Sequence, residues 1–118
     1  MNVAAMSMAW LEICGLNDIP RRGCRVVRGV RGEIAVFRTA ADEVFALDNR
    51  CPHKGGPLSE GIVHGKLVTC PLHNWVIGLV DGRATGADHG CTRSHGVRLE
   101  GSRVFLNIVI PPREEGTS

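Results

Sequence analysis

Two short segments of the sequence each combine a cysteine with a histidine. The first reads Cys51-Pro-His53, and the second, after 16 intervening residues, reads Cys70-Pro-Leu-His73. A thiolate and an imidazole this close on a tight loop can converge on one metal centre, and the proline after each cysteine stiffens the loop, so less entropy is lost on ligation. The pattern therefore predicts Cys51, His53, Cys70 and His73 as ligands of one metal centre built from two loops.

The segments around these loops predict β-strands that position them. Strands are predicted at residues 25–30, 33–38, 43–47, 66–69, 75–80, 97–100 and 103–110. Arg31-Gly32 is a two-residue hairpin signal between the first two strands, and Gly101-Ser102 separates the last two. Helical spacing never persists for ten residues without Gly or Pro, so no long helix is expected. The sequence thus predicts an all-β fold in which residues 49–90 form a loop-built site inserted in a β base.

Length and composition predict one small domain, and they argue against a nucleic-acid partner and a membrane span. The 118 residues carry 14 Lys+Arg against 12 Asp+Glu, a net charge of +2, and 43% of them are hydrophobic. We expect a single domain over residues 1–118 with one hydrophobic core and a frayed tail at 111–118. The near-balance of charge argues against a nucleic-acid partner, and no run of about 18 apolar residues is present to cross a membrane. The N-terminus lacks a secretory signal, so a cytoplasmic location is expected, where the five cysteines stay reduced.

The remaining charged and reactive residues have structural explanations. Residues 21–31 contain five arginines and no acidic residue, which is either a docking patch for an acidic partner or, more commonly, the solvent-exposed side of a strand. Surface or hydrogen-bonded histidines are expected at His64, His89 and His95. Packed thiols are expected at Cys14, Cys24 and Cys91.

The two Cys-His loops resemble the Rieske family, whose motif is C-x-H and C-x-x-H with a spacer of about fifteen or more residues. All four ligand positions match. The resemblance implies a [2Fe-2S] cluster, with Cys51 and Cys70 on the buried iron and His53 and His73 on the outer iron. It also implies the Rieske-type fold, which is three stacked antiparallel sheets with the cluster at the tip.

A single structural Zn²⁺ is the competing occupant, because it accepts two Cys and two His in a tetrahedron. Zinc sites usually space their ligands as C-x₂₋₄-C followed by H-x₃₋₅-H, whereas here each loop mixes one Cys with one His. The spacing therefore favours the cluster. A nucleophilic Cys with a His base is discarded, because that chemistry has no use for two duplicate pairs.

The loops also differ from those of the high-potential respiratory Rieske proteins, which carry a disulfide between the loops and a Ser and a Tyr hydrogen-bonded to cluster sulfurs. The disulfide positions correspond to Gly56 and Leu72 in this sequence, and the Ser and Tyr positions correspond to Trp75 and Ile77. Without these hydrogen bonds, the midpoint potential is expected toward the low end of the Rieske range, about −150 mV.

Within the family, the loops are most similar to the small subunit of assimilatory NAD(P)H-dependent nitrite reductase. The similarity rests on the string from Cys51 to Gly61, the string from Cys70 to Val76, Gly86-Ala87-Asp88 and Cys91. It implies a large siroheme flavoprotein subunit as partner, which carries FAD, a [4Fe-4S] cluster and siroheme and reduces nitrite to ammonium. This chain would act as a supporting subunit with no catalytic residue of its own. The alternative is a free Rieske ferredoxin that delivers electrons to a ring-hydroxylating dioxygenase.

Overall fold

The computed structural model describes residues 7–52, 55–72, 74–85 and 90–110 of the chain. Its strands and 3₁₀ helices are, in chain order, β1 (Ser7–Gly15), η1 (Leu16–Asp18), β2 (Gly23–Gly29), β3 (Gly32–Arg38), β4 (Val44–Asp48), η2 (Leu58–Glu60), β5 (Ile62–His64), β6 (Leu67–Thr69), β7 (Val76–Gly78), β8 (Ser94–His95), β9 (Val97–Glu100) and β10 (Arg103–Ile110). Within these ranges the only helices are three-residue 3₁₀ segments, and none could span a membrane. The predicted all-β class is confirmed.

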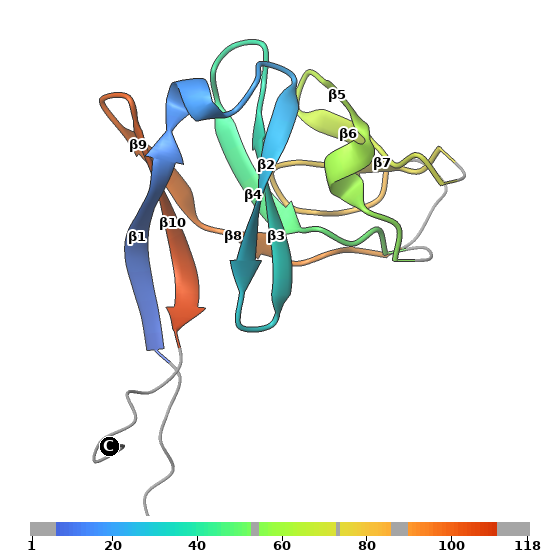
Figure 1. The fold of residues 1–118 in the computed structure, drawn as a ribbon. Helices are drawn as coiled ribbons and strands as arrows, with labels where there is room; N and C mark the ends of the chain where they lie inside the picture. Colours follow the sequence, from blue (N-terminus) through green and yellow to red (C-terminus); the bar gives the residue numbers. More distant parts are fainter. Residues whose placement is uncertain (1–6, 53–54, 73, 86–89, 111–118) are drawn as a thin grey trace, which may run out of the picture.

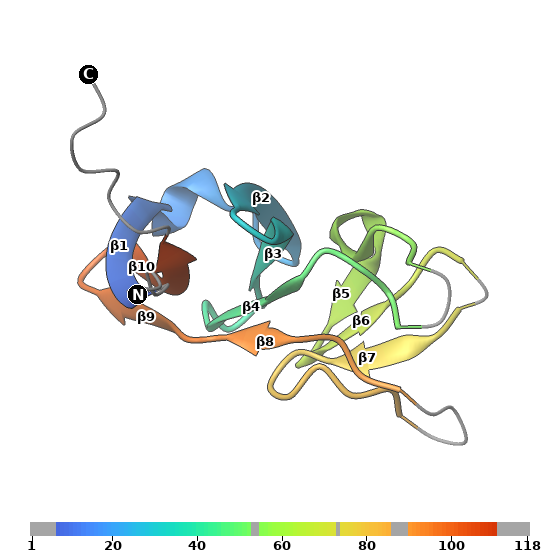
Figure 2. The ribbon, with the colours of Figure 1, turned by 90° about the horizontal axis from the view of Figure 1, so that it is seen from below.

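The strands form three antiparallel sheets that lie side by side along the molecule (Figures 1 and 2). The strand orders are β1-β10-β9, β2-β3-β4-β8 and β5-β6-β7. The second sheet lies in the middle and separates the sheet β1-β10-β9 from the small sheet β5-β6-β7. This arrangement agrees with the three stacked sheets that the Rieske resemblance implies.

The middle sheet is covered on both faces, which gives the protein two hydrophobic clusters. All residues from Ile34 to Arg38 in β3 are buried, as expected for a strand packed on both sides. Ala35 and Phe37 belong to the cluster shared with the small sheet, whereas Ile34 and Val36 belong to the cluster shared with β1 and β10. The prediction of one core is therefore wrong, because a strand alternates its side chains between two faces and here neither face meets water.

Of the ten strands in the described ranges, the sequence predicted seven, including the three-residue β6 and β7, and missed three, including the nine-residue β1. In the β2-β3 hairpin Gly29 pairs with Gly32, so the turn is Val30-Arg31, one residue before the predicted position. The strands β1, β5 and β8 were not predicted. In β1, exposed Met8 and Leu11 interrupt the alternation that would mark a strand, and pairing with β10 along its whole length defines it instead.

A buried arginine fixes the connection between the first two sheets. Arg38 is 6% exposed, and its Nη1 donates to the backbone carbonyls of Leu16 and Ile19 at 3.1 and 2.9 Å. Its Nε and Nη2 contact Asp42 Oδ1 at 3.0 and 2.9 Å. Hydrogen bonds from Arg21 and Arg38 lower the pKa of Asp42 from 3.8 to about 2. The β3-β4 turn and the segment around η1 are thus held by one charged network.

Candidate metal centre

The two candidate cysteines come from different loops but lie next to each other inside the protein. Cys51 follows β4 and is 2% exposed, and Cys70 follows β6 and is fully buried. Burial raises the pKa of the Cys70 thiol, the backbone N–H of Leu72 lowers it, and a hydrogen bond with the Cys51 thiol raises it further. The fold therefore brings together the two predicted sulfur donors at the end of the small sheet.

The first loop turns tightly around its cysteine. The backbone N–H of Cys51 donates to the Gly56 carbonyl and the N–H of Gly55 donates to the Cys51 carbonyl, both at 2.8 Å. Gly55 has a φ of +72°, a conformation that glycine adopts without strain. The predicted ligand His53 belongs to this loop in sequence, and it lies outside the described residues.

The second loop is a short connection between two paired strands. The backbone N–H of Cys70 donates to the Trp75 carbonyl at 2.7 Å, and Asn74 adopts a φ of 58°, which asparagine tolerates better than most residues. The N–H of Leu72 is directed at Cys70 Sγ at 3.4 Å. The predicted ligand His73 also lies outside the described residues.

The two loops touch each other at a glycine. A methyl group at Gly56 would lie 2.6 Å from Leu72 Cδ1 and 3.4 Å from Cys70 Sγ, so only a residue without a side chain fits there unless Leu72 moves. These are the two positions that would hold the inter-loop disulfide in a respiratory Rieske protein. Gly56 and Leu72 therefore lie in contact where the two loops meet.

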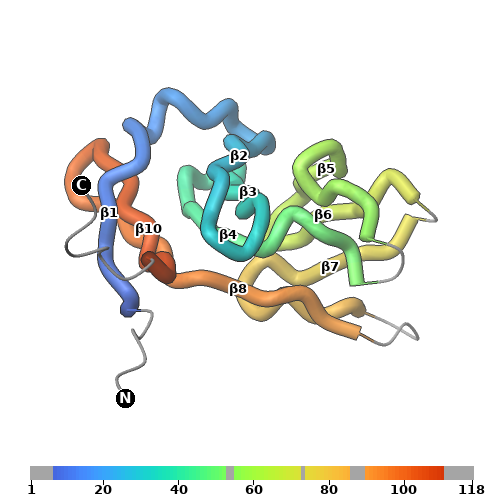
Figure 3. Tube along the Cα trace, turned by 60° about the horizontal axis from the view of Figure 1, so that its bottom comes forward, coloured from blue at the N-terminus to red at the C-terminus, as the bar shows by residue number. Residues whose placement is uncertain are grey.

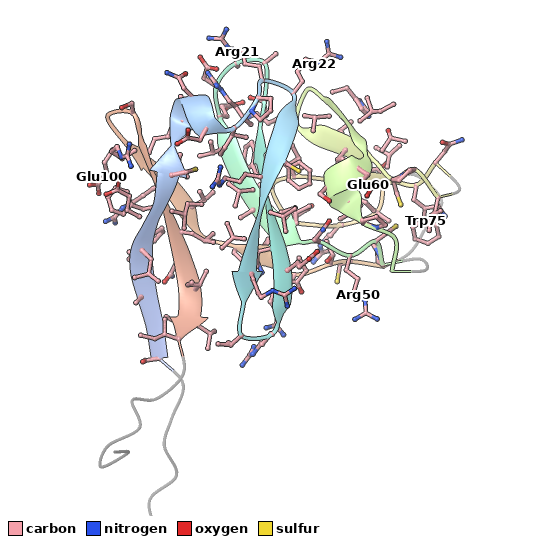
Figure 4. All side chains as sticks on the ribbon, in the orientation of Figure 1. Arg21, Arg22, Arg50, Glu60, Trp75 and Glu100 are labelled. Atoms are coloured by element: carbon pink, nitrogen blue, oxygen red, sulfur yellow. The ribbon has the colours of Figure 1, made fainter. Side chains whose placement is uncertain are left out.

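A third segment packs over the loops. The predicted site of residues 49–90 included only its first residue, Gly90, and residues 91–93 were not assigned to it. Residues 90–93 return beside the loops before entering β8, a path that Figure 3 shows from the small sheet toward β9. A methyl group at Gly90 would lie 3.2 Å from Pro52 Cβ and 3.9 Å from Trp75 Cζ3. Figure 4 shows Trp75 at this end of the molecule. The sequence signals here were Gly90, at the end of the predicted site, and Cys91, in the similarity to nitrite reductase small subunits, and neither reveals long-range packing.

The other cysteines differ in their environments. Cys14 and Cys24 are packed thiols as predicted, and burial raises the pKa of Cys24 to about 11. Cys91 is exposed, so its prediction as a packed thiol is wrong. The segment pairs with Arg83 through Cys91, and its side chains alternate, so that Thr92 is buried while Cys91 faces solvent. Cys91 borders the same hollow as Cys51.

Two of the remaining histidines are engaged in hydrogen bonds, as expected for residues without a ligand role. His64 Nε2 lies 2.7 Å from Thr69 Oγ1, and His95 Nε2 lies 2.7 Å from Asp48 Oδ1. His89 lies outside the described residues.

The described part of the site fits a centre that is bound through sulfur. The two buried, neighbouring thiols provide the sulfur half of a two-sulfur, two-nitrogen donor set. One backbone N–H is directed at a sulfur, and a glycine lies where the two loops meet. Among the residues that the structure describes, no three metal-binding side chains gather at one point. The assignment of all four ligands stays a prediction, since both imidazoles lie outside these ranges.

Comparisons with known proteins identify the family. The Rieske [2Fe-2S] domain matches residues 9–97. In sequence, the chain is 29% identical over 109 residues to the ferredoxin component of the naphthalene 1,2-dioxygenase/salicylate 5-hydroxylase systems of Ralstonia sp, covering 87% of this chain and 99% of that protein. It is 32% identical over 93 residues to ferredoxin CarAc of Metapseudomonas resinovorans, covering 78% and 84% of the two chains.

Solved structures agree with this assignment of the fold. A protein assigned as the small subunit of an NADH-dependent nitrite reductase from Mycobacterium tuberculosis matches with a TM-score of 0.77 at 22% identity, over 88% of this chain and 98% of that one. The ferredoxin of carbazole 1,9a-dioxygenase from Nocardioides aromaticivorans matches with a TM-score of 0.73 at 21% identity, with the same coverage. The chain therefore belongs to the Rieske [2Fe-2S] family, and its cofactor is a [2Fe-2S] cluster.

Proposed function

We propose that this chain is the small, electron-carrying subunit of an NAD(P)H-dependent nitrite reductase, with Cys51, His53, Cys70 and His73 as its cluster ligands. A [2Fe-2S] cluster exchanges one electron at a time with a partner protein. Nitrite reduction to ammonium is assigned to the large siroheme flavoprotein subunit, which holds FAD, a [4Fe-4S] cluster and siroheme. The chain therefore has no catalytic residue in this proposal.

The proposal rests on one observation: the loop residues that resemble nitrite reductase small subunits each have a structural role in the site. Gly55 adopts a positive φ, Gly56 contacts the second loop, and Leu58 is fully buried in the hydrophobic cluster that contains Cys51 and Cys70. In the second loop, Asn74 turns the backbone and Trp75 packs near Gly90. The strings that resemble nitrite reductase small subunits are thus the ones that build this site.

The chain's own residues hold the cluster and restrict its contact with water. The buried Cys51 and Cys70 are placed to bind one iron, while the histidines of the same loops would bind the other. Pro52, Leu72 and Trp75 provide apolar surface around the loops. Because exclusion of water tunes the potential of such a centre, these side chains are expected to influence its midpoint.

A second candidate function is a free Rieske ferredoxin that passes electrons to a ring-hydroxylating dioxygenase. It is favoured by relatives that are ferredoxin components, which match nearly along their whole length at 29% and 32% identity. The same four ligands would serve both functions, so the cluster itself does not distinguish them. In either case, the free thiols of the chain agree with the reducing cytoplasm that we propose as its location.

The test is to co-express the tagged chain with a siroheme flavoprotein subunit and to measure co-purification and NAD(P)H-dependent nitrite reduction. If the chain is the nitrite reductase subunit, the two proteins should form a stable complex, and nitrite reduction by that complex should depend on the small subunit. The isolated chain is assayed in parallel for electron delivery from a flavin reductase to a Rieske dioxygenase. Rapid reduction of the oxygenase, without binding to the flavoprotein, would overturn the proposal in favour of the ferredoxin.

The cluster assignment is tested separately on the purified chain. Iron, acid-labile sulfide and zinc are measured per polypeptide, with electron paramagnetic resonance spectra recorded before and after reduction. Iron and sulfide with a reducible signal are expected. Zinc without sulfide would contradict the cluster assignment, keep the loop geometry and leave only a structural role.

A further inference from the structure

Two polar hollows lie next to each other beside the first cluster loop. One has a volume of about 450 Å³ and is bordered by Cys51, Pro52 and Cys91. The other has a volume of about 340 Å³ and is bordered by Gly32 and Glu33 at the end of the β2-β3 hairpin. Both share Asp48, Arg50 and Gly55, so they form one continuous depression along this side of the loop.

Three arginines, which we call the arginine rim, border this depression. Arg50 lines both hollows, Arg93 lines the larger one and Arg31 lines the smaller one. All three are exposed. Figure 4 shows the Arg50 side chain extending away from the body of the molecule. Arg31 is the only one of the five arginines at residues 21–31 that reaches this depression.

The acidic groups of the depression are already engaged by other side chains. Asp48 Oδ1 lies 2.7 Å from His95 Nε2, and Glu33 Oε1 accepts a hydrogen bond from Asn49 Nδ2 at 3.0 Å. By contrast, no ion pair joins any rim guanidinium to a carboxylate within the described part of the chain. The depression is lined by three arginines against two carboxylates, so it keeps a net positive charge, and its guanidinium groups are available to another molecule.

The rim also lies close to the cluster loop. A methyl group at Gly55 would lie 3.4 Å from Arg50 Nε, so the Arg50 side chain runs over the loop that follows Cys51. Guanidinium groups bind carboxylates through parallel hydrogen bonds, and charged rims steer and orient protein partners. A partner docked here would approach the protein beside its electron-transfer centre.

We infer that the arginine rim is the docking surface for a carboxylate-rich patch on the protein that exchanges electrons with the cluster. The identity of that protein rests on the proposed function, but the chemistry of the surface does not. Arg50 and Arg93 flank the larger hollow and form its main contacts, and Arg31 extends the positive surface toward the hairpin.

The experiment compares cluster-loaded wild type with Arg50→Glu and Arg93→Glu. Arg25→Glu is the matched control, because Arg25 is also exposed and without an ion pair in the described chain, but lies on β2 near Cys14 and borders neither hollow. Binding is measured to the siroheme flavoprotein and, independently, to poly-L-glutamate. Iron content and the reduced spectrum of each variant establish that the site is intact.

At about 0.1 M salt each rim variant is expected to raise the dissociation constant for both probes by about tenfold, and Arg25→Glu by less than about twofold. The differences should shrink at about 1 M salt, where charge interactions are screened within about 3 Å. Equal weakening by Arg25→Glu, or unchanged poly-L-glutamate binding by both rim variants, overturns the inference. Failure of wild type to bind the flavoprotein, with rim-dependent binding of poly-L-glutamate, instead overturns the proposed function alone.

Discussion

Replacement of Gly82 by alanine is expected to disturb the site from a distance, through the segment that covers the loops. Gly82 has a φ of +74°, and its carbonyl accepts a hydrogen bond from Thr92 N–H at 2.8 Å. A methyl group there would lie 2.2 Å from the Thr92 carbonyl oxygen, whereas ordinary contact begins at 3.4 Å. Relief requires a backbone displacement of about 1.2 Å, the difference between these two distances. The displaced segment contains Cys91 and Arg93 and continues from Gly90, which packs near Pro52 and Trp75.

The expected loss of unfolding free energy in Gly82→Ala has two contributions, and a control variant, Gly101→Ala, separates them. Gly101 has a φ of +62° and no atom within 4 Å of the added methyl group, so Gly101→Ala carries only the backbone strain. That strain costs about 1 kcal/mol for a non-glycine residue. Overpacking against rigid backbone adds about 2 kcal/mol at Gly82. Gly82→Ala should therefore lose about 3 kcal/mol of unfolding free energy.

The assay is thermal unfolding of the iron-loaded protein, combined with iron and sulfide analysis of each variant. At about 4 °C per kcal/mol for a domain of this size, the expected decreases in Tm are about 12 °C for Gly82→Ala and about 4 °C for Gly101→Ala. Gly82→Ala should also retain less cluster during purification. Equal Tm values for the two variants would refute the reasoning, because they would show that the contact with Thr92 relaxes without cost.

Three further predictions concern the ligands, the potential and the acid limit of stability. Cys51→Ser should abolish bound iron and acid-labile sulfide, whereas Cys91→Ser should keep both. Iron and sulfide analysis of the two purified variants tests this prediction, and the reverse result would identify Cys91 as the ligand. The midpoint potential should lie near the low end of the Rieske range, about −150 mV, and a redox titration giving a value well above zero would contradict this. The pKa of Asp42 is lowered from 3.8 to about 2 by hydrogen bonds from Arg21 and Arg38, so its stabilisation is present above pH 3.8 and is lost as pH falls through about 2. Urea unfolding should find Asp42→Asn less stable than wild type at neutral pH, with the difference disappearing near pH 2; a difference independent of pH would exclude this titration as its cause.

The sequence predicted those parts of the fold that local patterns determine. Alternating apolar residues in residues 103–110 identified β10, and Val104 and Leu106 are fully buried. The strand β8 has only two residues and depends on pairing with Ala46 and Leu47 of β4, so no local pattern could reveal it. The second hydrophobic cluster escaped prediction for a similar reason, since it requires knowledge of which elements cover each face of the middle sheet.

The candidate site likewise has some features that the local sequence predicts and others that depend on long-range contacts. The motif located Cys51 and Cys70 on two loops, and the fold brings their buried thiols together. Nothing in the motif reveals that residues 90–93 pack beside Pro52, because this contact depends on hydrogen bonds of Thr92 and Ala84 to partners in different segments. Recognition of ligands from sequence is therefore possible here, whereas recognition of the surface around them needs the structure.

The separation of ligands from surface also explains why related proteins can share a cluster and serve different enzymes. The ligand loops are constrained from within by buried Cys70, Leu58 and the contact of Gly56 with Leu72. Arg50 and Arg93 are exposed, have no ion pair in the described chain and belong to neither hydrophobic cluster that holds the loops. We therefore expect substitution at these positions to alter partner binding at little cost in stability. We also expect the choice between a nitrite reductase subunit and a dioxygenase ferredoxin to depend on the inferred docking surface, and binding experiments with rim variants test this more directly than any measurement on the cluster.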